Sequence, residues 1–163
     1  MWRKELVHPL FVHFPIALLI IGSILLILVH SPLLIKAKSN LLFSSRLLLI
    51  AGSLFSWITV YTGTLADSVV GRHVCDPTVL EEHESYGYYV AIIFSIASLL
   101  EISFNFINNK INYGLLRSLK IFSLLLAISG SVLLGYEAHL GGKLVYQQAA
   151  GVHQPSVDCK EFE

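Results

Sequence analysis

Four stretches of about 20 residues with few or no charged side chains constrain the fold of this chain more than any other feature. They cover residues 9–29, 47–66, 86–106 and 119–138. Each is close to the roughly 20 residues that an α-helix needs to cross a bilayer. A hydrophobic share of 55% and a charged share of only 13% are typical of an integral membrane protein. The sequence therefore predicts an all-α fold, a four-helix transmembrane bundle, with residues 1–163 forming a single membrane domain.

The predicted spans place the remaining residues on two faces of the bundle. Face H holds both termini and the loop 67–85, and face K holds the loops 30–46 and 108–120. The short loops of face K carry these basic residues: Lys36, Lys38, Arg46, Lys110, Arg117 and Lys120. Because short cytoplasmic loops are enriched in Lys and Arg, we expect face K in the cytoplasm of a bacterium. Both termini would then lie on the extracytoplasmic side of the inner membrane.

The two cysteines of the chain, Cys75 and Cys159, both fall on face H. An extracytoplasmic face is an oxidising environment, in which these two thiols are able to form one disulfide. Two free thiols are the alternative interpretation.

Composition and motifs exclude several classes of function. The 11 basic and 11 acidic residues balance, and no basic stripe with interleaved aromatic side chains indicates a nucleic-acid partner. The chain has no C-x-x-C-H motif, which excludes covalent c-type haem. No internal repeat is evident, and the short loops leave no room for a separate catalytic domain. We therefore expect an electron carrier or a subunit rather than a complete enzyme.

Histidines gather at one end of the predicted bundle. Six of the seven fall on or near face H: His8, His13, His73, His83, His139 and His153. An imidazole without a partner is costly near hydrocarbon, so this cluster favours a bound metal, a haem or a proton path. A stripe of small residues at four-residue spacing begins at Ser123 and continues to His139, which predicts that this imidazole faces inward. In the first span we expect His13 to point inward and His8, about 140° away, to lie at the mouth.

Two kinds of cofactor suit these histidines. Haem b needs axial imidazoles that project from facing helices. We expect His13 and His139 to form the first axial pair. His8 and His83 form a second set, so that one or two haems could bind. The alternative is a divalent transition metal, namely zinc, iron or copper, held by His13, His83 and His139.

Carboxylates lie at the same face. We expect Asp67 and Glu137 to orient ligating imidazoles or to accept protons. Glu84 is a further carboxylate that could join a metal site. Histidines that only anchor helix ends at the membrane interface are the interpretation without a cofactor.

Two segments of the sequence carry a resemblance to a known family. The stretches His8 to Leu19, HPLFVHFPIALL, and Ala138 to Tyr146, AHLGGKLVY, resemble predicted four-span bacterial membrane proteins classed as a domain of unknown function. The resemblance implies that the histidines of the family fall on His8, His13, His83 and His139. Some members are joined to Rieske iron–sulfur or c-type haem domains. This implies electron transfer near the outer face, with a Rieske protein or a c-type cytochrome as partner.

The expected function is that of a membrane cytochrome b-like protein. It would bind haem near the outer leaflet and relay electrons between a quinone and an extracytoplasmic acceptor. The quinone rests on the family resemblance and on membrane depth. A non-haem metal-binding protein and an assembly subunit of a larger membrane complex are the alternatives, and an oligomer is compatible with each.

Overall fold

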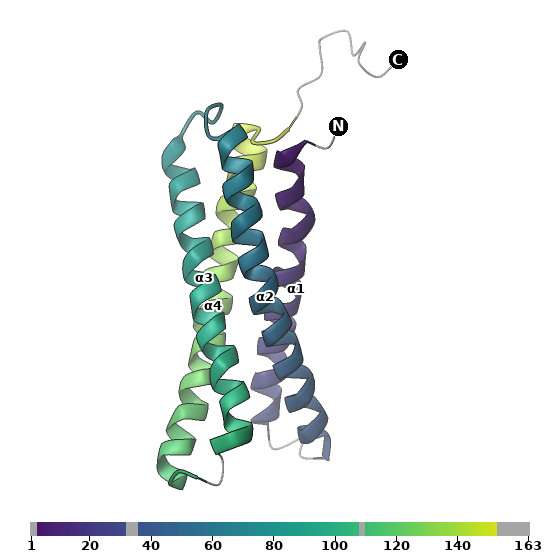
Figure 1. The fold of residues 1–163 in the computed structure, drawn as a ribbon, viewed down its shortest axis with the longest axis vertical. Coiled ribbons are helices and arrows are strands. Elements are labelled where there is room, and N and C mark those ends of the chain that lie inside the picture. The colour runs from purple at the N-terminus through teal and green to yellow at the C-terminus, as the bar shows by residue number, and fades with distance from the viewer. Residues whose placement is uncertain (1–2, 32–35, 108–109, 153–163) are drawn as a thin grey trace.

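The chain folds into four long helices. The computed structural model describes residues 3–31, 36–107 and 110–152, and within these ranges it contains no strand. The elements are a short 3-10 helix at Lys4–Leu6, α1 (Val7–Val29), α2 (Lys38–Val70), α3 (Pro77–Ile107) and α4 (Tyr113–Gln148). They run up and down, so that α1 begins at the end of the bundle where α4 finishes (Figure 1). The predicted all-helical fold with four possible membrane spans is confirmed.

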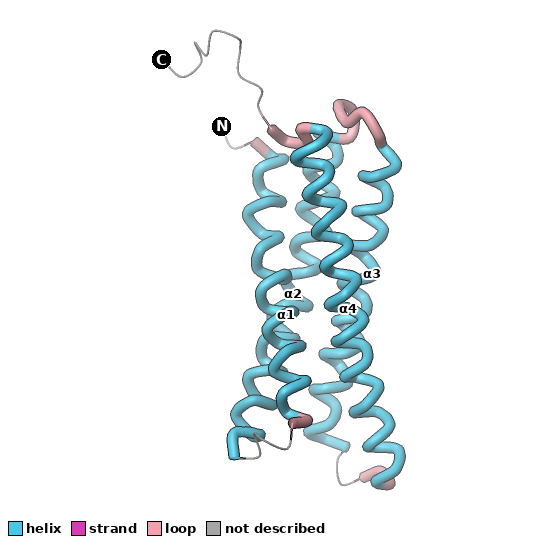
Figure 2. Tube along the Cα trace, turned by 180° about the vertical axis from the view of Figure 1, so that it is seen from behind, coloured by secondary structure: helices cyan, strands magenta, loops and turns pink. Residues whose placement is uncertain are grey.

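The helices surround a common axis in chain order. Helix α1 packs on α2, α2 on α3 and α3 on α4, and a looser contact between α4 and α1 closes the ring (Figure 1, and from behind in Figure 2). The most extensive contacts lie within the two hairpins, α1 with α2 and α3 with α4. Helices α1 and α3 are therefore diagonal to each other. A side chain that points from α1 to the centre of the bundle faces one that points inward from α3.

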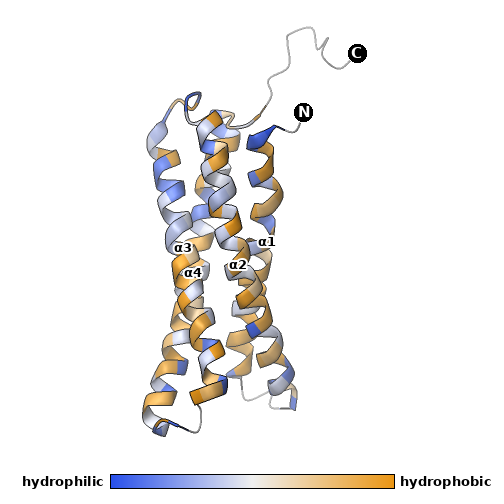
Figure 3. Ribbon diagram, in the orientation of Figure 1, coloured by the Kyte–Doolittle hydropathy of each residue, from blue (hydrophilic) through white to orange (hydrophobic). Residues whose placement is uncertain are grey.

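The helices extend beyond the predicted spans. Helix α2 begins at Lys38 rather than at residue 47, and α4 continues to Gln148 rather than ending near residue 138. At 1.5 Å per residue, a helix as long as α4 measures roughly 54 Å, whereas the hydrocarbon core is about 30 Å thick. Figure 3 shows hydrophobic residues along the middle of the bundle and more hydrophilic residues towards its ends. A helix of this length that crosses a bilayer extends beyond its hydrocarbon core, where polar residues are tolerated and hydropathy no longer marks the helix.

Glycines allow the two helices of each hairpin to approach closely. A Cβ atom on Gly52 of α2 would lie 2.6 Å from Cδ2 of Leu19 on α1. A Cβ atom on Gly130 of α4 would lie 2.9 Å from Cε2 of Phe94 on α3. Such close approach drives helix association in lipid, where the hydrophobic effect between helices is absent.

The first helices of the two hairpins bury equivalent positions. His83 lies 75 positions after His8, and this shift aligns α1 with α3. Every buried residue of α1 then falls on a buried residue of α3. The pairs are Pro15 and Val90, Leu19 and Phe94, Gly22 and Ala97, Ser23 and Ser98, Leu26 and Glu101, and Val29 and Phe104.

The second helices, α2 and α4, correspond in the same way under a shift of 78 positions. Six of the seven buried residues of α2 fall on buried residues of α4, and the seventh, Ser53, falls on the half-buried Ser131. The two close-packing glycines, Gly52 and Gly130, are equivalent. The two hairpins thus repeat one pattern of burial. The equivalence lies in which positions are buried, and few of the paired residues are identical.

Candidate functional site

His8 lies on the inner face of α1. It precedes the buried Pro15 by seven residues, or about two turns, so both residues face the bundle interior. Its Nδ1 atom lies 3.1 Å from the carbonyl oxygen of Thr59 on α2 and 3.4 Å from Oγ1 of Thr62. A Cβ atom on Gly63 would lie 3.3 Å from Cε1 of the ring. The imidazole therefore packs against the backbone of α2 at Gly63, where no side chain intervenes. This contact and the hydrogen bond to Thr59 fix the position of the ring.

His83 repeats this arrangement in the second hairpin. It precedes the buried Val90 by seven residues, and its side chain is only 15% exposed. Its Nδ1 atom lies 3.1 Å from the carbonyl oxygen of Glu137 on α4. A Cβ atom on Gly141 would lie 3.1 Å from Cε1 of the ring. The shift that aligns α2 with α4 also aligns the accepting carbonyls and the adjacent glycines of the two hairpins.

The two imidazoles meet across the diagonal of the bundle. The ring centres of His8 and His83 are 6.2 Å apart, and the ring planes are nearly perpendicular, at 84°. Each Nδ1 faces a carbonyl oxygen, which can only accept a hydrogen bond, so each Nδ1 carries the hydrogen. In a neutral imidazole the lone pair then lies on Nε2. The site therefore presents two neighbouring imidazoles, each with its Nε2 lone pair free of the hydrogen bond made by Nδ1.

Glu137 adds a carboxylate to the second imidazole. The residue is 7% exposed, and its Oε1 atom lies 3.2 Å from Nδ1 of His83. On an ideal helix it lies about 40° from the buried Ser123, which explains its inward direction. A carboxylate beside the Nδ1 hydrogen orients a ligating imidazole and increases its basicity. We expected Glu137 to orient an imidazole, and the one that it contacts is that of His83.

His13 and His139 lie on the exposed surface of the bundle, so the prediction that they point inward was wrong. His13 is two residues from the buried Pro15, which places it about 160° away from Pro15 around α1. On α4, each four-residue step exceeds a full turn by about 40°, so His139 lies about 160° from Ser123. The spacing argument failed because it was continued over too many turns. His13 and His139 therefore do not join His83 at the centre.

The other predicted residues lie apart from the two imidazoles. Asp67 and Glu84 line a separate hollow between the end of α2 and the start of α3. Cys75 is an exposed free thiol. Cys159 and His153 fall outside the described residues, so the disulfide stays a prediction. Among the residues that the structure describes, no three His, Cys, Asp or Glu side chains are grouped to hold a metal ion.

The sequence did not indicate the backbone groups and neighbouring residues that hold the imidazole rings of His8 and His83. The residues concerned are Thr59, Thr62, Gly63 and Gly141. One signal could have found the arrangement, since His8 and His83 each precede a buried residue by seven positions. Seven residues are close to two full turns, so this spacing keeps a side chain on the core face.

Comparison with known proteins gives one family. The family model described as "Predicted membrane protein (DUF2231)" matches residues 5–154. No curated protein and no solved structure matches the chain. The matched range includes all four long helices and both inward-facing imidazoles.

Proposed function

This chain belongs to the DUF2231 family of predicted membrane proteins, and we propose that it is a cytochrome b-like electron carrier of the bacterial inner membrane. His8 and His83 would supply the two axial ligands of one haem b. The observation that carries the proposal is the pairing of these rings across the bundle centre, with each Nδ1 held by a backbone carbonyl.

The separation of the two rings suits a shared metal. A bond from a histidine nitrogen to a metal is about 2.0–2.1 Å long, and the nitrogen lies about 1.1 Å from the ring centre. Two imidazoles on opposite sides of one metal therefore have centres roughly 6 Å apart. The observed distance between the ring centres is 6.2 Å. The interior of a four-helix bundle is also a common place for a cofactor bound by facing helices.

The set of ligands favours haem over a bare metal ion. A tetrahedral zinc site uses three or four protein ligands. The described residues bring only two imidazoles together, and the Glu137 carboxylate lies on the Nδ1 side of His83. Haem supplies four ring nitrogens itself and needs only two axial ligands from the protein.

Each residue of the site has a separate part in this proposal. His8 and His83 would hold the haem, which would supply one-electron redox chemistry. The carbonyls of Thr59 and Glu137 hold the two rings in one tautomer. The Glu137 carboxylate adds electron density to the His83 ring. The basic residues of face K support an extracytoplasmic face H, where a quinone and a c-type cytochrome or Rieske protein would exchange electrons with the site.

Visible spectroscopy of the purified protein tests the proposal. We expect the protein in mild detergent to show the oxidised and dithionite-reduced spectra of a bis-histidine haem. His8→Ala and His83→Ala should each abolish this spectrum. His13→Ala and His139→Ala are matched controls on the exposed surface and should leave it unchanged. A colourless protein with stoichiometric zinc or copper, or a haem spectrum that survives both His8→Ala and His83→Ala, would refute the proposal.

A further inference from the structure

A buried polar cluster lies at the opposite end of the bundle, at face K. Glu101 of α3 is 3% exposed, and its Oε2 accepts a hydrogen bond of 3.1 Å from Nε of Arg46 on α2. Its Oε1 accepts a hydrogen bond of 2.8 Å from Oγ of Ser123. Nη1 of Arg46 donates to Oδ1 of Asn105 at 2.5 Å. These bonds hold the guanidinium in a fixed position between α2 and α3.

At the positions that correspond to this ion pair in the repeated burial pattern, the chain has two leucines. Leu26 occupies the position equivalent to Glu101, and Leu124 occupies the position equivalent to Arg46. Leu26 is buried in the core, and Leu124 packs against it. The leucines thus occupy α1 and α4 at positions that correspond to those of the charged pair on α3 and α2. Since charges within membrane helices are costly and usually functional, the pair indicates a ligand site.

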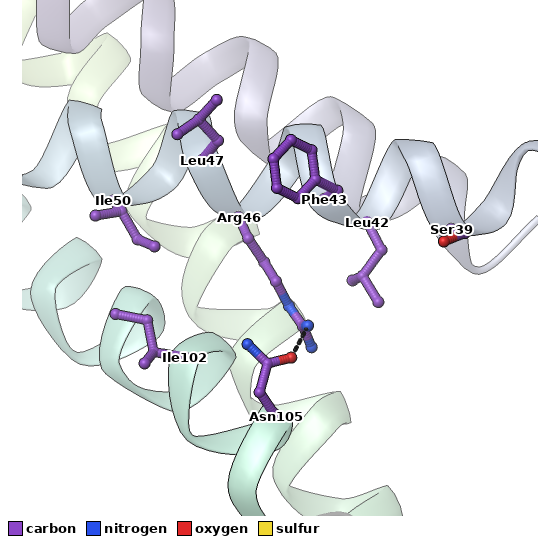
Figure 4. Close-up of a pocket in the computed structure, with 8 residues that line it drawn as sticks. All are labelled: Ser39, Leu42, Phe43, Arg46, Leu47, Ile50, Ile102 and Asn105. Atoms are coloured by element: carbon purple, nitrogen blue, oxygen red, sulfur yellow. Dashed lines mark hydrogen bonds between the residues drawn. The ribbon is translucent and has the colours of Figure 1, made fainter.

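Arg46 borders a cavity between α2 and α3. The cavity has a volume of about 350 Å³, and in Figure 4 the Arg46 side chain extends across it towards Asn105. Apolar side chains form most of the remaining wall: Leu42, Phe43, Leu47, Ile50 and Ile102. Phe43 is 69% exposed and Leu47 is 56% exposed, so this wall continues onto the lipid-facing surface of α2. Within the described residues, Nη2 of Arg46 has no hydrogen-bond partner.

The charge of face K favours an anion in this cavity. The segments 30–46 and 108–120, which include the start of α2 and the start of α4, carry six basic residues and no Asp or Glu. Basic pockets between membrane helices bind the headgroups of anionic lipids. An arginine is suited to hold a phosphate because its planar guanidinium offers several donors.

We propose that this cavity binds one anionic phospholipid, such as phosphatidylglycerol, from the leaflet next to face K. The phosphate accepts hydrogen bonds from the guanidinium of Arg46, whose place is fixed by Glu101. An acyl chain lies along Leu47, Ile50 and Ile102. The lipid would link α2 to α3, which form the more extensive of the two contacts between the hairpins.

Native mass spectrometry of the full chain tests this site. The protein is extracted from vesicles that contain equal amounts of phosphatidylglycerol and phosphatidylcholine, and the retained lipids are counted. The wild-type protein should keep one phosphatidylglycerol in preference to phosphatidylcholine. The double variant Arg46→Leu/Glu101→Leu places leucines where the corresponding positions of α1 and α4 have Leu26 and Leu124, and it should retain about five- to tenfold less phosphatidylglycerol. Arg117→Gln removes one exposed charge of face K away from the cavity and should retain as much as the wild type.

A second variant keeps the test independent of the buried charges. Ile102→Trp narrows the cavity and leaves the ion pair in place, so it should reduce retention of phosphatidylglycerol to a similar extent. Thermal unfolding in detergent checks that each variant is folded. The proposal is overturned if the wild-type protein retains both lipids equally, if Ile102→Trp retains as much as the wild type, or if Arg117→Gln loses as much as the double variant.

Discussion

Gly141→Ala is the most specific test of how the His83 imidazole is held. The added Cβ would lie 3.1 Å from Cε1 of His83 and 3.6 Å from its Nδ1. Carbon atoms in ordinary contact are about 3.5–4.0 Å apart, so the ring would have to move by roughly half an ångström. The hydrogen bond from Nδ1 to the Glu137 carbonyl, now 3.1 Å, would then exceed the usual limit of about 3.2 Å. Such overpacking costs about 1–3 kcal/mol.

Under the proposed function, that cost should appear in the binding of haem. A loss of about 1–3 kcal/mol weakens affinity roughly 5- to 150-fold, because every 1.4 kcal/mol is a factor of about ten. The assay is a haem titration of the apoprotein, followed by the Soret band. Gly142→Ala is the matched control, because a Cβ at this neighbouring position meets nothing within 4 Å while the gain in helix propensity is the same. Equal affinities of Gly141→Ala and Gly142→Ala would refute the reasoning.

Three further perturbations test the electrostatics of the molecule. Under the proposed function, Glu137→Gln removes a negative charge beside the His83 imidazole at alkaline pH, where the Glu137 carboxyl is ionised. A redox titration at alkaline pH should then show a midpoint potential raised by roughly 30–60 mV, where 59 mV is a tenfold change for one electron. An unchanged potential would contradict this role. The hydroxyl and then the backbone N–H of Thr78 donate to Oδ1 of Asp76, which lowers the pKa of Asp76. This cap on α3 should therefore be intact above about pH 4 and be lost as the pH falls through the lowered pKa. Amide exchange in the first turn, corrected for intrinsic rates, should accelerate there in the wild type and show no such step in Asp76→Asn. Arg46→Leu alone leaves Glu101 buried without its charged partner and should lower the free energy of unfolding by about 3–5 kcal/mol. The double variant Arg46→Leu/Glu101→Leu should recover most of this lost stability. Equal free energies of unfolding for the two variants in chemical denaturation would contradict the argument.

The number and type of the helices followed from hydropathy alone. Lipid excludes charged residues from the middle of each span, so the four apolar stretches were visible without any alignment. The helix ends were not predictable in this way. The segment from Lys38 to Arg46 is charged and polar, yet it continues α2, because helical hydrogen bonds do not depend on hydropathy.

The candidate site was predicted in its composition and only partly in its geometry. Histidines at one end were evident, and His8 with His83 was the second of the two pairs considered. The preferred pair, His13 and His139, was wrong because both side chains lie on the outer surface of the bundle. For His139 the error came from the four-residue spacing, in which each step exceeds a full helical turn by about 40°. The carbonyl of Thr59 and the bare backbone at Gly63 could not be predicted, because they depend on how α1 and α2 pack together.

The repeat of two hairpins has a consequence for how the protein would mature. Under the proposed function, each hairpin would contribute one of the two histidine ligands, so neither hairpin alone could hold the haem. The haem could therefore bind only after the two hairpins had packed against each other. The bound haem would then link α1 to α3 across the centre of the bundle. This link would matter because the contact between α1 and α4 is the least extensive of the four contacts between neighbouring long helices.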